Sequence, residues 1–247
     1  VALALLILTA ACGKKPEYKK VKLRAPGRNG TPVKASQGES VSIAIAPVLS
    51  PEISFILYKD LLDYITRKSG IHVDLVQKTT YSEVNELLRN GDCDVAIICT
   101  GAYARAIREF PLEILAVPQI NGETAYYSAI IVSSASPVKY FSQLENKTFA
   151  FCDMLSLTGY LYVKHRMKQM NRDLKNYFGR AIFTHGHDCS IRAVADGVVD
   201  GAAVSSIVYN NLLSNGDSYA RKTKIIEKSD AFGMPPIVAR KGLGAKI

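Results

Sequence analysis

The sequence lacks the short motifs that mark phosphate-transferring enzymes and serine hydrolases. No Gly-x-x-x-x-Gly-Lys-Ser/Thr loop is present to cradle nucleotide phosphates, and no Gly-x-Ser-x-Gly turn is present to expose a nucleophile. A hydrolase triad could be assembled only from Ser156, His187 and Asp188. Because His187 and Asp188 are adjacent in the chain, their side chains point in different directions. We therefore predict that the protein is not an enzyme and keep a hydrolase as the weaker alternative.

The sequence also lacks the spacings that are typical of metal sites and disulfide frameworks. Its five cysteines form no Cys-x-x-Cys pair. Cys93, Cys99 and Cys152 lie in or beside apolar runs and are predicted to be small core residues. His185 and His187 form a His-x-His pair without a third ligand, which is a weak indication of zinc. We therefore expect no metal, no other cofactor and no disulfide.

The composition is that of a folded chain, with 48% apolar and 21% charged residues. The net charge of +9 is concentrated in residues 13–40, which hold eight basic and two acidic residues, +6 in all. This segment is interrupted by Pro and Gly and has no pattern of a structured basic face, so nucleic-acid binding is not expected. We interpret 13–40 as a flexible basic linker near an anionic surface. A solvated tail without a partner remains equally open.

The chain begins with an apolar run, Val1 to Ala11, that is too short to span a bilayer. The run is typical of the hydrophobic part of a secretory signal, although the expected basic region before it is missing, so we expect the natural chain to start earlier. Leu-Thr-Ala-Ala-Cys at 8–12 resembles a bacterial lipobox. We predict a lipoprotein signal peptide at 1–12 with Cys12 as the lipidated residue. The alternative is an ordinary signal peptide with an incidental cysteine.

From Val41 onward, short apolar runs alternate with amphipathic stretches, and the alternation occurs twice. This order predicts parallel sheets covered by helices, arranged as two α/β lobes with a cleft between them. The predicted strands are 41–46, 73–76, 95–99, 114–118, 125–132, 149–152, 181–183, 201–204, 224–228 and 237–239. The predicted helices are 52–69, 82–90, 158–170, 190–196 and 205–213.

A hydroxyl-rich turn between a predicted strand and a helix is the first candidate for an anion site. Ser156 and Thr158 supply hydroxyl donors, and Gly159 lets the backbone approach a ligand closely. The N-terminus of a helix adds unpaired backbone N–H groups and positive dipole, so an anion can be held there without a fixed charge. The alternative is an ordinary Ser/Thr helix cap.

A second strand-to-helix junction carries His187, which could donate to the same anion from another direction. The alternative is a histidine without a ligand. Arg192, one turn further along, is expected on the solvated face of the helix.

Four segments together resemble one protein family. They are Ser-Leu-Thr-Gly-Tyr at 156–160, His-Asp-Cys-Ser-Ile-Arg-Ala-Val-Ala at 187–195, Gly-Ala-Ala-Val at 201–204, and the stretch 80–96. In order and spacing they are similar to the phosphonate, phosphite and phosphate periplasmic binding proteins, over roughly residues 41–239. The resemblance implies the type II periplasmic-binding-protein fold. We assign 41–132 with 229–247 to the first lobe and 133–228 to the second, with hinges near Val132 and Lys228.

The resemblance also implies site residues. It places Tyr81 in the first lobe, Ser156, Thr158, Gly159 and His187 in the second, and Tyr127 near the hinge. Tyr81 and Tyr127 could instead be ordinary tyrosines at the cleft edge. Two features depart from the family pattern. Ser205 and Ser206 stand where aminophosphonate binders carry a carboxylate, and the chain ends at Ile247 before the usual final helix, so the first lobe is expected to be under-packed.

The implied function is that of a solute-binding protein of an ABC importer for a small phosphorus oxyanion. Its expected partners are that ligand, an ABC permease with its ATPase, and the membrane through the lipid anchor. We expect a monomer at the periplasmic or extracytoplasmic face of the membrane. A ligand-sensing module of the same fold is the alternative within this class.

Overall fold

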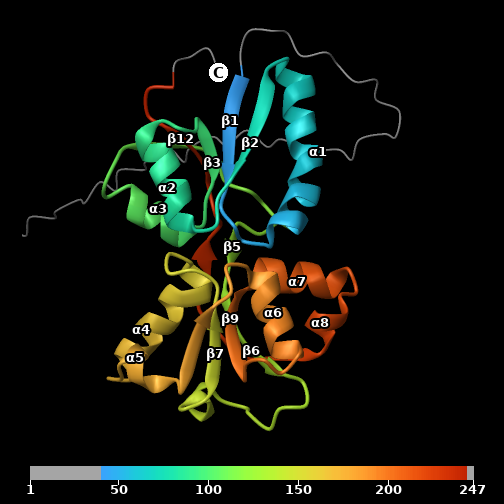
Figure 1. The fold of residues 1–247 in the computed structure, drawn as a ribbon, viewed down its shortest axis with the longest axis vertical. Coiled ribbons are helices and arrows are strands. Elements are labelled where there is room, and N and C mark those ends of the chain that lie inside the picture. Colours follow the sequence, from blue (N-terminus) through green and yellow to red (C-terminus); the bar gives the residue numbers. More distant parts are fainter. Residues whose placement is uncertain (1–39, 244–247) are drawn as a thin grey trace, which may run out of the picture. The chain divides into compact units, whose positions relative to one another are not determined.

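The computed structural model describes residues 40–243, which belong to one compact unit. The predicted signal peptide, Cys12 and the linker up to residue 39 lie outside these residues. Within the described range the strands form two five-stranded sheets and a two-stranded ribbon (Figure 1). The first sheet with its helices is called lobe 1 below, and the second sheet with its helices is called lobe 2.

Lobe 1 is built on a mixed sheet in the order β2-β1-β3-β12-β4. β1 is parallel to β2 and β3, whereas β12 returns from the end of the chain and runs antiparallel to β3 and β4. The strands are β1 (Ser40–Ile45), β2 (His72–Gln77), β3 (Val95–Ile97), β4 (Leu112–Ala116) and β12 (Ile237–Arg240). The helices are α1 (Pro51–Ser69), α2 (Tyr81–Asn90) and α3 (Thr100–Ala106).

Local signals explain where the helices of lobe 1 begin and end. α2 starts with a capping box, in which Thr80 accepts from the backbone N–H of Glu83 and the Glu83 carboxylate accepts from the N–H of Thr80. α1 and α2 end at Gly70 and Gly91, with φ of 73° and 79°, in the left-handed region that glycine adopts without strain. The helix ends predicted from the sequence are confirmed within one residue.

Lobe 2 has a sheet in the order β10-β6-β9-β7-β8. β7 is parallel to β8 and β9, and β6 is antiparallel to β9 and β10. The strands are β6 (Ser128–Ser133), β7 (Thr148–Phe151), β8 (Arg180–Phe183), β9 (Gly201–Ser205) and β10 (Thr223–Lys228). The helices are α4 (Tyr162–Gln169), α5 (Leu174–Tyr177), α6 (His187–Ala195), α7 (Ser206–Ser214) and α8 (Ser218–Arg221), with a 3₁₀ turn at Phe141–Leu144.

The structure corrects the predicted boundary between the lobes. β6 pairs with β9 and β10, so residues 128–132 belong to lobe 2 and not to lobe 1 as predicted. The chain crosses between the sheets at β5 (Ala125–Tyr126) and β11 (Phe232–Gly233), which pair with each other. The predicted hinge positions Val132 and Lys228 lie inside paired strands. The apolar run 129–132 would fit the middle of either sheet, and only its hydrogen-bond partners decide between them.

The two lobes differ in how their apolar residues are packed. Lobe 2 has an aromatic core in which the Phe149 and Phe178 rings stack at 4.3 Å between centroids. In lobe 1, by contrast, several large apolar side chains of α1 and of the β4 region are exposed: Phe55, Ile56, Leu57, Ile114, Leu115 and Val117. An apolar groove of about 250 Å³ lies between α1 and the sheet.

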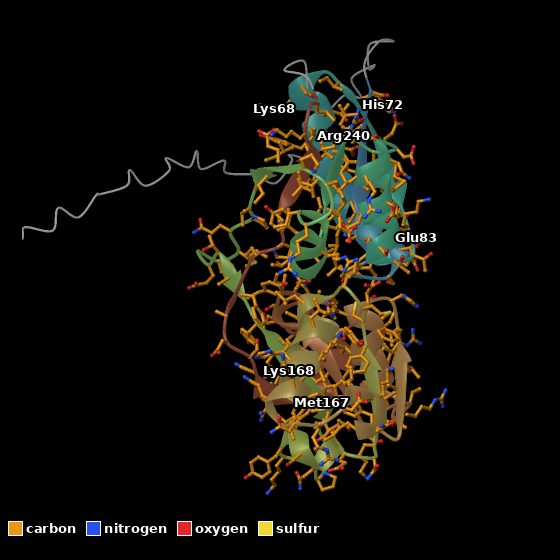
Figure 2. All side chains as sticks on the ribbon, turned by 90° about the vertical axis from the view of Figure 1, so that its left-hand side faces the viewer. Lys68, His72, Glu83, Met167, Lys168 and Arg240 are labelled. Atoms are coloured by element: carbon orange, nitrogen blue, oxygen red, sulfur yellow. The ribbon has the colours of Figure 1, made fainter. Side chains whose placement is uncertain are left out.

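Figure 2 shows the distribution of side chains along lobe 1. Glu83, in the first turn of α2, lies at the end of lobe 1 that contacts lobe 2, whereas Lys68, His72 and Arg240 lie at the opposite end (Figure 2). Among residues 40–243, no helix is both long enough and apolar enough to cross a bilayer.

Candidate functional site

The turn that follows β7 brings three of the predicted site residues into contact. Ser156 caps a π-helical turn (Leu157–Leu161), and its Oγ accepts from the backbone N–H of Gly159 at 3.0 Å. A Cβ on Gly159 would lie 2.7 Å from the Cβ of Cys152, 2.8 Å from the Ser156 Oγ and 2.9 Å from the His187 Cε1. Only glycine fits there. Single π-helical turns of this kind occur frequently at functional sites.

Thr158 presents a buried hydroxyl that has no partner within residues 40–243. Its side chain is 1% exposed, and its Oγ1 makes no hydrogen bond there. Its backbone oxygen accepts from the Ser128 Oγ at 2.6 Å, which holds the turn against β6. Leaving a buried polar group unpaired costs about 1–3 kcal/mol. The unpaired Thr158 hydroxyl carries this cost and lies beside two other predicted site residues, which indicates a place for a ligand.

His187 is buried at the first position of α6, and its neighbours determine its tautomer. The backbone N–H of Ser205 donates to its Nδ1 at 3.2 Å, so Nε2 carries the proton of the neutral ring. Burial lowers the pKa of His187 to about 3. The ring is therefore a neutral hydrogen-bond donor through Nε2. Its backbone N–H donates to the Val48 oxygen of lobe 1 at 2.9 Å.

Tyr81 is the contribution of lobe 1. It is fully buried at the start of α2, and its hydroxyl lies 3.6 Å from the Cys152 Sγ of lobe 2. Burial first, and the neighbouring Cys152 thiol second, raise the pKa of Tyr81 well above its usual range, so the phenol keeps its proton. Cys152 was predicted only as a core residue. Its position one residue after β7, directly before the hydroxyl-rich turn, was the sequence signal for a place at the site.

Two carboxylates of lobe 2 cap helix starts of lobe 1, which the sequence did not reveal. The Asp153 Oδ2 accepts from the backbone N–H of Tyr81 at 3.1 Å. Asp188 accepts from the backbone N–H of Ser50 at 3.0 and 3.2 Å, just before α1. Because Asp188 is engaged with lobe 1 and the Nδ1 of His187 is an acceptor, these residues do not form the hydrolase triad considered above.

Tyr127 and Arg192 lie apart from this cluster. Tyr127 is half-buried, its ring lies 4.9 Å from the Nζ of Lys228, and its backbone N–H donates to the Ser206 Oγ at 3.0 Å. No hydrogen bond joins it to the other predicted site residues within the described range. Arg192 is exposed and pairs with Asp196 at 3.5 Å, so its predicted place on the solvated helix face is confirmed.

A polar cavity of about 650 Å³ lies along α2 and α3 and reaches Ser82 and Leu155, the chain neighbours of Tyr81 and Ser156. Its charged groups form ion pairs with one another. Arg89 pairs with Glu86 and Glu109, and Arg105 pairs with Glu109. Since these arginines already have carboxylate partners, the cavity offers an anion less than the buried cluster does. We therefore place the candidate site at the cluster of Tyr81, Cys152, Ser156, Thr158, Gly159 and His187.

Comparison with known proteins gives an independent view of the chain. Residues 43–247 match the family model described as ABC transporter, phosphonate, periplasmic substrate-binding protein. The Phosphate-import protein PhnD of Mycolicibacterium smegmatis is 24% identical over 221 residues, which is 85% of this chain and 68% of that protein.

Two solved structures show the same fold. One is a binding protein component of an ABC phosphonate transporter from Pseudomonas aeruginosa, with a TM-score of 0.76 at 21% identity, covering 84% of this chain and 70% of that one. The other is PhnD1 from Prochlorococcus marinus in complex with methylphosphonate, with a TM-score of 0.74 at 18% identity, covering 83% and 78% of the two chains. The predicted two-lobe α/β fold is confirmed.

Proposed function

Because the chain belongs to the family of phosphonate-type periplasmic substrate-binding proteins of ABC transporters, we propose that it binds a small phosphorus oxyanion between its two lobes and delivers it to an ABC importer. The family is extracytoplasmic and consists of transporter substrate-binding proteins, not enzymes. Beyond family membership, we propose which ligand the protein binds and which residues hold it.

The observation that carries the proposal is the unpaired Thr158 hydroxyl, buried beside a cluster of donors. Ser156 and Thr158 belong to the turn that begins a helical segment, and His187 is the first residue of another helix. Tyr81 adds a hydroxyl from lobe 1. A tetrahedral oxyanion has acceptors in several directions, which donors from two lobes can satisfy together. We propose that these four side chains, with the backbone at Gly159, form the binding shell.

We propose a phosphonate, phosphite or phosphate as the ligand, and the names of the relatives mention phosphonate and phosphate. An amino-bearing ligand is disfavoured at the junction of β9 and α7, where the chain has Ser205 and Ser206 and no carboxylate, and both Asp153 and Asp188 already accept backbone N–H groups. The Ser205 N–H and the Ser206 hydroxyl are already engaged with His187 and with Tyr127. Tyr127 is proposed only to border the site near the β5–β6 junction.

The protein also needs a membrane attachment and transporter partners for this function. We propose lipid anchoring through Cys12, a monomeric state, and docking to a permease and its ATPase. Mass spectrometry of the native protein is expected to show a diacylglyceryl group on an N-terminal cysteine. An unmodified chain that starts elsewhere would contradict the anchor without affecting the ligand site.

Isothermal titration against phosphate, phosphite, methylphosphonate and 2-aminoethylphosphonate tests the ligand class. We expect binding of at least one of the first three and weaker or no binding of the fourth. A ligand present at about 100 times its Kd should stabilise the fold by about 2.7 kcal/mol in a parallel thermal melt. If none of the four binds or shifts the melt, the proposed function is wrong.

A further inference from the structure

The groups that converge on the candidate site are all uncharged donors. They are the hydroxyls of Tyr81, Ser156 and Thr158 and the Nε2–H of His187. Burial, the first cause in each case, raises the pKa of Tyr81 and lowers that of His187, so neither group changes its charge near neutral pH. Within the described residues, no Lys or Arg makes a hydrogen bond to any of them.

The charges closest to these donors are negative. Asp153 and Asp188 each accept backbone N–H groups at the contact between the lobes. After burial, which is the largest cause, the field of Asp153 helps to raise the pKa of Tyr81, and both carboxylates help to raise the pKa of the Cys152 thiol. The titratable groups that act on the buried Cys152 thiol are Tyr81, Cys99, Asp153 and Asp188. The helices of these groups also carry Glu83, Glu86 and Arg89 on α2 and Cys189 and Arg192 on α6.

The basic side chains of the described residues have other partners. Arg89 and Arg105 line the cavity that reaches Ser82 and Leu155, but they pair with Glu86 and Glu109. Lys228 is over the ring of Tyr127, and Arg192 is paired with Asp196 on the outer face of α6. Lys68 and Arg240 are at the far end of lobe 1 (Figure 2). Within residues 40–243, an anion that enters the cluster therefore meets neutral donors and two nearby carboxylates, and no Lys or Arg is hydrogen-bonded to those donors.

The cost of burying an ion rises steeply with its charge, and a buried group without a counter-ion tends to keep or take up a proton. A second negative charge would also be repelled by Asp153 and Asp188. A hydroxyl such as that of Thr158 can accept a hydrogen bond as well as donate one, so it can serve a protonated oxygen.

From this arrangement we propose that the site selects the singly charged form of its ligand, in which at least one phosphorus-bound oxygen still carries a proton. This inference rests on the proposed function and names the protonation state of the ligand. It covers the monoanions of phosphite, methylphosphonate and phosphate. It excludes oxyanions that remain doubly charged at neutral pH, such as sulfate.

The test is isothermal titration of the wild-type protein with methylphosphonate and phosphite over the pH range in which each ligand loses its second proton. The apparent affinity should fall about tenfold for each pH unit above that ionisation, because only the monoanion is competent. The pH at which the affinity begins to fall should differ between the two ligands, because their second pKa values differ. Titration in two buffers of different ionisation enthalpy should show that, above the second pKa of the ligand, about one proton is taken up for each ligand bound.

An affinity that stays level or rises with pH, or binding without proton uptake, would overturn the inference and leave the proposed function intact. If the affinity for both ligands falls at the same pH, the group that titrates belongs to the protein. That result would also overturn the inference. If phosphate, phosphite and methylphosphonate all fail to bind at every pH, the proposed function itself is wrong and this inference falls with it.

A matched pair of variants locates the source of the selectivity. Asp153→Asn removes one of the two charges but keeps an acceptor for the N–H of Tyr81, and should make the fall with pH shallower. Asp200→Asn changes a carboxylate of the same lobe that is bonded to Thr148, away from the site, and should leave the pH profile unchanged. If the affinity falls with pH equally in the two variants, Asp153 does not contribute to the selection of the singly charged ligand.

Discussion

Lobe 2 provides most of the candidate site, and lobe 1 provides one side chain and several backbone groups. Ser156, Thr158, Gly159 and His187 are held by hydrogen bonds or close contacts within lobe 2 itself. Tyr81 joins them across the contact between the lobes. The difference suggests a division of labour. Lobe 2 carries most of the donors, here called its half-site, and lobe 1 adds Tyr81.

The same contrast appears in the cores. The aromatic rings of lobe 2 pack behind the turn that carries the site, whereas lobe 1 leaves apolar side chains of α1 and the β4 region exposed. Close packing limits the movement of the side chains that it holds. Four predictions test this difference between the lobes.

The largest effect is expected in the core of lobe 2. Phe149→Ala removes a fully buried ring that stacks on Phe178, and should lower the free energy of unfolding by about 3–5 kcal/mol. Leu57→Ala in lobe 1 changes a side chain that is 53% exposed and should cost less than about 0.5 kcal/mol. Urea unfolding of both variants measures the difference. Similar losses would mean that the two lobes are equally well packed.

The second prediction concerns the half-site. Thr158→Val removes the unpaired hydroxyl, and a hydrogen bond to a charged ligand contributes about 1.5–3 kcal/mol. Affinity should therefore fall about ten- to a hundredfold. Arg192→Ala, on the outer face of α6, is the control and should bind as the wild type does. If isothermal titration shows the reverse pattern, a salt bridge holds the anion and the half-site is misplaced.

The third prediction is a pH dependence that originates in lobe 2. His187 has a pKa of about 3 in the folded state, against an ordinary 6.5 when unfolded. Between these values the unfolded chain binds more protons, so stability falls as the pH falls below about 6.5. The loss should be about 1 kcal/mol for each pH unit. Other groups titrate in this window, so the measurement is urea unfolding of wild type and His187→Gln at two pH values. If the wild type and His187→Gln lose the same free energy of unfolding between the two pH values, the prediction is wrong.

The smallest effect is expected at the contact between the lobes. Asp188→Asn weakens the carboxylate cap on Ser50, at a cost of about 0.5–1.5 kcal/mol. We expect a larger radius of gyration without ligand, because the lobes separate more often, and the wild-type value once ligand is bound. Asp200→Asn, within lobe 2, should change neither value. Small-angle scattering decides, and an unchanged radius would show that Asp188 does not hold the lobes together.

Much of the fold could be predicted because its signals are local. The capping box at Thr80 and Glu83 and the glycines that end α1 and α2 act within four or five residues, so they can be read directly from the sequence. The turn from Ser156 to Gly159 belongs to the same class. Its hydroxyls and its glycine are close neighbours in the chain.

Other features depend on residues far apart in the sequence. The Nδ1 of His187 meets the N–H of Ser205, 18 residues later. Asp153 reaches Tyr81 across 72 positions, and Asp188 reaches Ser50 across 138. The apolar residues of β6 fit either sheet, so their pairing was assigned to the wrong lobe. The longer helices, most of the strands and the donor-rich turn after β7 could be predicted from the sequence, because neighbouring residues set them. The short helices α3, α5 and α8 were not predicted, and α6 begins at His187 and not at residue 190. Which lobe β6 joins, which nitrogen of His187 donates and which charges surround the site depend on the tertiary structure, because hydrogen-bond partners and local fields are set by distances in space.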